Sequence, residues 1–388
     1  MMRFYYLGIA LMFLWVSTVQ KVVAQQTTGS NTSQTNGVYP AVPFLLITPD
    51  ARAGAMGEAG VAITPDGNAM SINPAKLAFL ERPYGVSLSY SPWLKSLVPD
   101  INLAYLSGFF QVDDKTVIGG SLRYFSLGEI ALTNENGGQE GIFSPNELAF
   151  DATYSRKFGE NFSLGTSARF IRSNLTSGQV SGSQQKAGNA LAVDVSAFFK
   201  KPTVLFGKDA ILSAGLNLSN IGTKMSFSDT GEKLFLPANM KLGGASTFII
   251  DDYSQFVFAL DFNKLMVPTQ PIVDGNGKIV AGKDPNRSVP AGIIGSFGDA
   301  PGGFSEELKE VGISTGVEYI YNQQFAVRAG YFYESPEKGD RRYFTVGGGL
   351  KYNMFNLDFS YLIADPQNSP LANTLRFSLA LNFDKVSK

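Results

Sequence analysis

Few side chains in this sequence have the type and spacing that catalysis or metal binding requires. Residues 312–316 read GISTG and match the G-x-S-x-G nucleophile motif as a string, but the chain has no histidine to act as the base. Residues 274–278 read DGNGK and begin like a calcium loop, yet Lys278 stands where an oxygen ligand belongs. The glycine run 347–349 lacks the spacing of a phosphate-binding loop. We therefore expect no catalytic residue, no metal site and no cofactor.

The composition excludes further classes of function. The 388-residue chain has no cysteine, which removes disulfides, thiol nucleophiles and zinc–thiolate sites. It has no histidine, which removes the side chain that titrates most readily near neutral pH. The formal net charge is only -1 and gives no electrostatic reason to expect nucleic acid as a partner. We expect a protein that is not an enzyme.

The N-terminus has the pattern of a secretory signal peptide. Arg3 precedes an apolar run over residues 4–19, and small residues precede Gln25. Such a run is too short to span a bilayer easily. We expect residues 1–24 to be a signal peptide and residues 25–43, which begin with a Gln-, Thr-, Ser- and Asn-rich stretch, to be a mobile leader. The mature protein is then periplasmic, secreted or located in the outer membrane.

From Tyr84 onward, apolar residues alternate with polar or small ones in segments of about 9 to 13 residues, the length and period of tilted membrane strands. In 355–363, for example, Phe, Leu, Tyr and Ile occupy one face while Asn, Asp and Ser occupy the other. The sequence predicts an all-β fold over 84–388, a transmembrane antiparallel β-barrel of about fourteen strands. The expected strands start near Tyr84, Ile101, Thr116, Glu147, Phe162, Ala187, Ala210, Asn239, Gln255, Val311, Phe325, Tyr343, Phe355 and Thr374.

The expected connections alternate between two lengths. Short connections are expected at 113–115, 159–161, 251–254, 322–324 and 353–354, with a somewhat longer one at 201–209. Long connections are expected at 127–146, 175–186, 221–238, 264–310 and 334–342. Short periplasmic turns and long extracellular loops are typical of outer-membrane barrels. The competing interpretation, a periplasmic β-protein, gives no reason for this sorting by length.

The assignment of faces sorts the charged residues to the lumen. Ten charged residues of both signs fall on the polar faces of their strands: Asp151, Arg169, Asp194, Lys241, Asp261, Glu318, Arg328, Lys351, Asp358 and Arg376. One interpretation is that they pair with each other and with charges of an N-terminal plug. The other is that they line a polar conduction path. Mixed charge beside a glycine-rich segment favours the filled interior.

That segment, residues 44–83, resembles neither a strand nor an exposed loop. Its core, 44–79, is dense in alanine and glycine, which let backbones approach closely, and its prolines limit any helix to a short piece. The sequence predicts a compact plug inside the barrel. The plug residues of interest are Asp50, Arg52, Asn73 and Pro74.

Several large apolar residues fall in the expected extracellular loops. They are Trp93, Leu94, Leu97, Phe235, Leu236 and Met266. Such residues can brace a loop or lie at the lipid interface, but an exposed group of them marks a partner surface. We expect them to be partner-binding residues.

Two stretches carry a resemblance to a known family. Residues 43–57 read PFLLITPDARAGAMG and residues 73–79 read NPAKLAF. Together they closely resemble the PorV family, also called LptO, which are outer-membrane barrels of the Bacteroidetes type IX secretion system and belong to the wider FadL-like proteins. The C-terminus departs from the common pattern of outer-membrane barrels, because Phe383 is followed by residues 384–388 rather than ending the chain.

The resemblance implies a function that composition does not show. PorV-like proteins associate with the SprA (Sov) translocon barrel, collect cargo that bears a C-terminal signal domain, and deliver it to the attachment complex that contains the PorU sortase. The expected partners are therefore SprA, cargo signal domains, the PorU complex and outer-membrane lipid. The alternatives are a FadL-type transporter of hydrophobic small molecules and a simple porin.

Overall fold

The computed structural model of the chain describes residues 37–93, 100–133, 138–175, 179–180, 183–184, 186–228, 231–364 and 371–384. All of them belong to the second of the two units into which contacts divide the chain, Asn36–Lys388. The expected signal peptide and residues 25–36 of the expected leader lie outside the described residues. None of the helices within the described ranges is long and apolar enough to cross a membrane.

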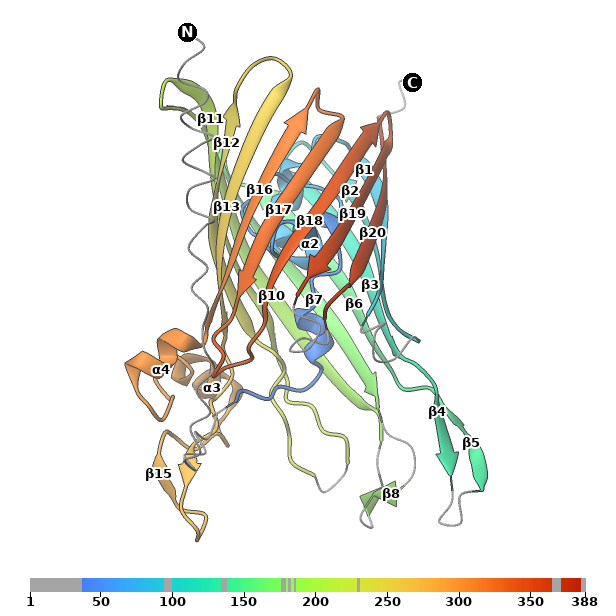
Figure 1. Ribbon diagram of the computed structural model, residues 1–388, viewed down its shortest axis with the longest axis vertical. Coiled ribbons are helices and arrows are strands. Elements are labelled where there is room, and N and C mark those ends of the chain that lie inside the picture. The colour runs from blue at the N-terminus through green and yellow to red at the C-terminus, as the bar shows by residue number, and fades with distance from the viewer. Residues whose placement is uncertain are drawn as a thin grey trace, which may run out of the picture. The chain divides into compact units, whose positions relative to one another are not determined.

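Fourteen strands of the described residues close into one antiparallel barrel, in which successive wall strands pair and β1 pairs with β20 (Figure 1). The wall strands are β1 (Tyr84–Pro92), β2 (Ile101–Gln111), β3 (Thr116–Leu127), β6 (Asn146–Lys157), β7 (Phe162–Asn174), β10 (Gly188–Leu205), β11 (Lys208–Gly222), β12 (Asn239–Ile249), β13 (Ser254–Leu265), β16 (Val311–Tyr321), β17 (Phe325–Tyr333), β18 (Arg342–Tyr352), β19 (Phe355–Ile363) and β20 (Leu375–Phe383). Each starts within two residues of its predicted position. The predicted fold class, a barrel of fourteen strands, is confirmed.

The alternation that predicted the strands is visible in their burial. Along β20, Arg376 and Ser378 are each only 1% exposed, whereas Phe377 and Leu379 are 46% and 42% exposed. Successive side chains of a strand point to opposite faces of the sheet. The outer face of the wall is therefore apolar and the inner face polar, as a barrel in a bilayer requires.

The charged residues assigned to the lumen follow the same rule. Seven are buried: Asp151, Arg169, Asp194, Asp261, Glu318, Arg328 and Arg376. Lys241 and Asp358 are partly buried. Lys351 is exposed instead, because it lies at the end of β18, next to the turn at 353–354.

The outward position of Leu379 gives a test of this register. We expect Leu379→Arg to destabilise the barrel by about 2 to 4 kcal/mol, because it places a cation on the lipid face near mid-membrane. Leu379→Phe, which keeps that face apolar, is the control and should assemble normally. Heat-modifiable migration of the refolded barrel in gels measures both. Equal assembly of the two variants would mean that the faces are assigned wrongly.

The connections alternate between short turns at one end of the barrel and long loops at the other (Figure 1). One predicted turn is wrong in length. The connection expected at 201–209 is only Phe206–Gly207, because β10 and β11 continue to pair as far as Leu205 and Lys208. Both turn residues adopt positive φ, 53° and 74°, as tight two-residue hairpin turns do. We call the two ends of the barrel the turn end and the loop end.

The long loops carry secondary structure of their own. Two-stranded sheets are formed by β4 (Ile130–Thr133) with β5 (Gln139–Phe143), β8 (Gln179–Val180) with β9 (Ser183–Gln184), and β14 (Ile272–Val273) with β15 (Ile279–Ala281). The loop between β13 and β16 also contains α3 (Val289–Gly295) and α4 (Phe304–Lys309). These elements gather at the loop end of the barrel (Figure 1).

The segment before β1 folds into short helical pieces within the barrel (Figure 1). They are η1 (Pro43–Leu46), α2 (Ala51–Ala55), η2 (Ala69–Ser71) and η3 (Pro74–Phe79). Their alanine, glycine and methionine residues are almost completely buried. The plug-like N-terminal region predicted from the sequence is confirmed. The described end of the expected leader joins this region, since Ala41 and Val42 are also buried.

Candidate functional site

The plug is fixed to the inner wall by hydrogen bonds from its backbone. The amide nitrogen of Ala51 donates to Ser378 Oγ at 2.9 Å, and the nitrogens of Gly60 and Val61 donate to Asp261 Oδ2 at 2.7 and 2.9 Å. The nitrogen of Gly57 donates to Thr345 Oγ1 at 2.8 Å. Short helical pieces leave many backbone groups without partners of their own, and the polar inner face supplies those partners.

Two of the four predicted plug residues cap the helical pieces. Asp50 is buried and its Oδ2 accepts from the Ala53 nitrogen at 2.8 Å, which caps α2. Asn73 caps η3, and its Nδ2 donates to the carbonyl oxygens of Val61 and Ala197. Asn73 thus joins two parts of the plug to strand β10. Asp50 and Asn73 have structural positions inside the barrel.

Pro74 and Gly165 form one of the closest contacts between plug and wall. Pro74 is the first residue of η3, a position where its missing N–H costs nothing. A Cβ added to Gly165 on β7 would lie within 3.0 Å of the Pro74 carbonyl carbon and the Ala75 backbone. The wall therefore needs glycine here so that the two backbones can touch.

Arg52 carries the main ionic link between plug and wall. Its guanidinium donates to both carboxylate oxygens of Glu318 at 3.1 and 2.8 Å and to Asp66 at 3.0 Å. Glu318 also accepts from Arg328, which in turn donates to Asp358 at 2.6 Å. The prediction that lumen charges pair with each other and with the plug is confirmed for this group.

A second buried network lies on β6, β7, β10 and β11. Arg169 donates to Asp151 at 2.5 Å and to Asp194 at 3.0 Å, and it also bonds Asn220. All four side chains are at most 5% exposed. A third pair joins Arg376 to Glu58 of the plug at 3.2 Å. Charges of both signs therefore fill the lumen as bonded pairs.

Sequence reasoning missed several residues of this interior. Arg123 on β3 donates to the carbonyl oxygens of Phe44, Leu45 and Ile47, and Lys76 in η3 donates to the carbonyl oxygen of Gly60 at 2.8 Å. Arg123 is two residues from the inward Ser121, so the alternation along β3 could have predicted that Arg123 also faces the lumen. The local sequence around Lys76 is alanine-rich and gave no such signal.

The apolar loop residues predicted to bind partners are largely buried. Trp93 and Phe235 are each 8% exposed, Leu236 is 3% exposed and Met266 is 2% exposed. The expectation that these four side chains form an exposed group is wrong, because the loops pack on one another. Leu94 and Leu97 lie outside the described residues.

Phe235 shows how this packing works. Its ring lies against Gly292 of α3, where a Cβ would approach ring carbons within 3.0 Å, and Lys224 Nζ lies 4.3 Å from the ring centroid. Its carbonyl oxygen accepts from the Ala41 nitrogen at 2.8 Å. Phe235 thus joins three segments that are distant in the sequence.

Other apolar side chains are exposed at the loop end. They lie in and between α3 and α4, at Ile294 (76%), Phe297 (48%), Phe304 (76%) and Leu308 (58%). Phe304 and Leu308 are four residues apart and share one face of α4. We call these four residues the α3–α4 apolar set. Apolar side chains grouped at a surface mark contact sites for other molecules.

A network of ion pairs fixes the segment that carries this set. Lys264 at the end of β13 donates to Glu307 and Glu310 at 3.0 and 2.8 Å, and Lys338 donates to Glu306 and Glu310. Burial lowers the pKa of Lys338, but its hydrogen bonds to the two carboxylates outweigh burial and hold the pKa above its usual range. α4 is therefore attached to the barrel rim by charged groups, while its apolar residues remain free to make contacts.

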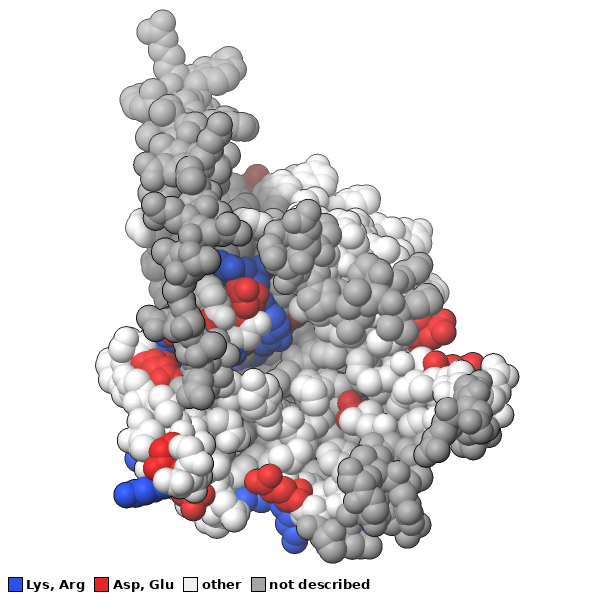
Figure 2. Space-filling view, turned by 60° about the horizontal axis from the view of Figure 1, so that its bottom comes forward, with Lys and Arg blue, Asp and Glu red and all other residues white. Residues whose placement is uncertain are grey.

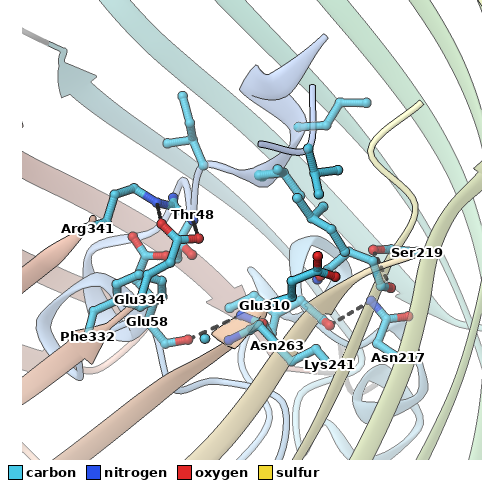
Figure 3. A pocket seen from close by; sticks show the side chains of 18 of the residues that line it. Thr48, Glu58, Asn217, Ser219, Lys241, Asn263, Glu310, Phe332, Glu334 and Arg341 are labelled. Atoms are coloured by element: carbon cyan, nitrogen blue, oxygen red, sulfur yellow. Dashed lines mark hydrogen bonds and ion pairs between the residues drawn. The ribbon is translucent and has the colours of Figure 1, made fainter. Parts of the chain in front are cut away.

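A small cavity of about 100 Å³ lies between the plug and strands β11, β12, β13, β16 and β17 at the loop end (Figure 3). On one side of the cavity Arg341 donates to Glu334 at 2.8 Å, and Lys241 donates to the carbonyl oxygen of Glu58. Figure 2, in which the loop end comes forward, shows acidic and basic side chains gathered in a hollow. Apolar side chains, among them Leu45, Ile47 and Phe332, line the cavity together with these charged groups.

The protein family of this plugged barrel follows from comparison with family models. Residues 30–272 match the model of the type IX secretion system protein PorV. The chain belongs to the PorV family. As a member of this family with a closed fourteen-strand barrel, it is an outer-membrane protein of type IX secretion. No curated protein sequence matches the chain.

Solved structures share the fold of this PorV-family protein. The TodX deltaS2S3 mutant monoaromatic hydrocarbon channel matches with a TM-score of 0.53 and 16% identity, over 86% of this chain and 99% of that chain. The P. putida toluene transporter TodX matches with a TM-score of 0.50 and 13% identity, over 88% and 99%. The CymD monoaromatic hydrocarbon channel has a TM-score of 0.50 and 14% identity, over 87% and 98%. At these identities the likeness concerns the fold.

Membership of the PorV family also orients the barrel. In outer-membrane barrels the short turns lie in the periplasm and the long loops at the cell surface. The α3–α4 apolar set is therefore extracellular, the small cavity lies toward that end of the barrel, and the turn end is periplasmic.

Proposed function

We propose that this protein takes cargo bearing a C-terminal signal domain from the SprA (Sov) translocon barrel and delivers it to the surface attachment complex that contains the PorU sortase. The observation that carries the proposal is the α3–α4 apolar set, which exposes four large side chains at the extracellular end of a PorV-family barrel. Cargo that has crossed the membrane meets the protein at this end.

The filled lumen supports binding outside the barrel. The plug contacts the wall through Arg52, Asn73 and the backbone nitrogen of Ala51 and through the close approach at Gly165. A polypeptide would have to displace this packing to pass through. A shuttle that holds its cargo at the extracellular loops has no such requirement.

The loop end offers the kind of surface that binds a folded domain. Interface energy concentrates in a few large apolar anchors, and Phe304 and Leu308 stand on one face of a helix that ion pairs fix to the rim. The loop that carries Leu94 and Leu97 is a second proposed contact. Trp93, Phe235, Leu236 and Met266 then support the loops from within.

A FadL-type transporter of hydrophobic small molecules is the alternative, since the chain shares its fold with hydrocarbon channels. Such a function requires an apolar path from the loop end into the barrel. The cavity at the loop end is lined by both charged and apolar side chains, but its volume is only about 100 Å³. Pockets that hold small molecules usually have about 300 Å³ or more, so the size of the cavity favours the cargo proposal over the transporter.

The test is a substitution of the apolar set. We expect Phe304→Asp/Leu308→Asp to weaken binding of a purified cargo signal domain by about 100-fold, because two anchors are lost and two charges are introduced. The barrel should assemble normally, since both side chains are exposed and make no core contact. Binding is measured on protein reconstituted in nanodiscs, and surface display of cargo is measured in cells.

The matched control is Ile130→Asp/Ile142→Asp, which introduces the same two charges at side chains that are 49% and 69% exposed on the β4–β5 hairpin. It should leave cargo binding unchanged. If the α4 variant keeps full cargo binding and display but loses uptake of hydrophobic small molecules, the transporter is the better assignment.

A further inference from the structure

The wall has one hairpin that is longer than the others. β10 and β11 have 18 and 15 residues. The other wall strands have between 9 residues, as in β1, and 13 residues, as in β7. Pairing of β10 with β7 ends at Phe199, but its pairing with β11 continues to Leu205. On the β7 side, residues 200–209 therefore project beyond the neighbouring strand at the periplasmic end, whereas on the other side Lys208 still reaches the β12–β13 turn at Ile250. We call them the projecting hairpin.

The tip of this hairpin exposes an aromatic side chain. Phe206 is 95% exposed and has a φ of 53°, a left-handed conformation that bulky residues rarely adopt. Its ring stacks on Phe248 with a centroid distance of 6.4 Å, and Phe248 meets Phe258 on the outer face of the wall. The tip is thus continuous with the lipid-facing surface, in the position where outer-membrane barrels carry an aromatic girdle.

Charges on the projecting hairpin are sorted between its two faces. Lys201 is two residues from the outward Phe199 and lies on the same face, and Lys208 is four residues from the outward Leu212 and also shares its face. Asp209 lies on the opposite face. Lys208 Nζ donates to the carbonyl oxygen of Ile250, and Lys201 pairs with no side chain among the described residues. The outward face therefore combines apolar and basic side chains without an acidic one.

The free edge of β10 is not suited to adding another strand. The Lys200 nitrogen donates to the carbonyl oxygen of Asn161, and the next residue whose backbone faces that edge is Pro202. Proline has no N–H to offer, and natural proteins place it on edges that must stay unpaired. Occupancy by a peptide strand is disfavoured, so the outward face remains as the contact surface.

We propose that the projecting hairpin docks on the periplasmic leaflet of the outer membrane, with Phe206 inserted among lipid chains and Lys201 and Lys208 contacting lipid phosphate groups. Aromatic rings favour the boundary between hydrocarbon and water, and lysine side chains reach from that boundary to anionic headgroups. The surface continues the lipid-facing wall, and its charge is complementary to phosphate. The hairpin acts as a lateral anchor that fixes this side of the barrel against the leaflet.

Tryptophan fluorescence tests the insertion. We expect the emission of Phe206→Trp in nanodiscs, after subtraction of the wild-type signal from Trp93, to be quenched by phosphatidylglycerol brominated near the headgroup end of its chains. Phe304→Trp is the matched control, since that side chain is 76% exposed and belongs to α4 at the loop end. Quenching of the position-206 variant no greater than that of the control overturns the proposal and indicates an aqueous partner, such as an acidic periplasmic protein.

Lipid mixtures test the role of the lysines. In bilayers of brominated phosphatidylglycerol and unbrominated phosphatidylcholine, the Phe206→Trp variant should favour phosphatidylglycerol, and adding Lys201→Glu/Lys208→Glu should lower this preference by about tenfold. Adding Lys115→Glu instead, which makes one such charge reversal at the β2–β3 turn, should leave the preference unchanged. An unchanged preference in the double lysine variant overturns the headgroup contact.

Discussion

Gly330→Ala is expected to destabilise the barrel by about 3 kcal/mol or more, although it adds a single methyl group. Gly330 lies on the inner face of β17, and a Cβ at this position would overlap the backbone of Met56 and Gly57, well inside the 3.0 Å limit of real contacts. Both sides of the contact are backbone, one part of a closed sheet and the other part of a packed plug. Neither can move aside as a flexible side chain would.

The matched control for this prediction is Gly108→Ala on β2, where a Cβ would meet its nearest atoms at 3.6 Å. That distance is ordinary van der Waals contact, so this variant should unfold at the same urea concentration as the wild type. Urea unfolding in detergent measures both. A barrel that survives Gly330→Ala should also conduct ions more readily in planar bilayers, because its plug no longer seats. If the Gly330 variant unfolds at the same urea concentration as the wild type, the close packing is contradicted. If the wild type conducts as an open pore, the plug is contradicted.

The wall could be predicted from the sequence because lipid outside and a polar lumen inside impose a period of two on every strand. A shift of one residue would place Arg376 in lipid and Phe377 in the lumen, so each register is strongly determined. β10 shows where the pattern ends. Lys200, Lys201 and Pro202 interrupt the apolar alternation at the point where the strand leaves the bilayer, and strand pairing with β11 continues without it.

The plug could be predicted as a segment but not as a set of contacts. Its alanine and glycine content indicates close packing, but the partners of Lys76 and Asn73 come from residues that are distant in sequence or lie on other strands. The same limit applies to the loops. Whether Met266 or Phe304 is exposed depends on how the loops fold over one another, and the two residues look alike in the sequence.

Arg169→Met should cost about 3 to 5 kcal/mol of unfolding free energy, because it leaves two buried carboxylates without their shared cation. Arg169 bonds both Asp151 and Asp194, and each of the three side chains is at most 5% exposed. After the change, the hydrogen-bond donors left within the described part of the chain are Ser121 Oγ for Asp151 and the Asn220 nitrogen for Asp194. Those two donors cannot offset the desolvation of two negative charges.

The triple variant Asp151→Asn/Arg169→Met/Asp194→Asn distinguishes the effect of unbalanced buried charge from the effect of the lost hydrogen-bond geometry. It removes every ionised group of this network, so most of the lost stability should return even though the hydrogen bonds are fewer. Lys309→Met is the surface control, since its pair with Glu337 is exposed and should contribute at most about 1 kcal/mol. Thermal unfolding of the four proteins in the same detergent gives the comparison. If the triple variant is as unstable as Arg169→Met, the network stabilises the wall by its geometry and not by balancing buried charge.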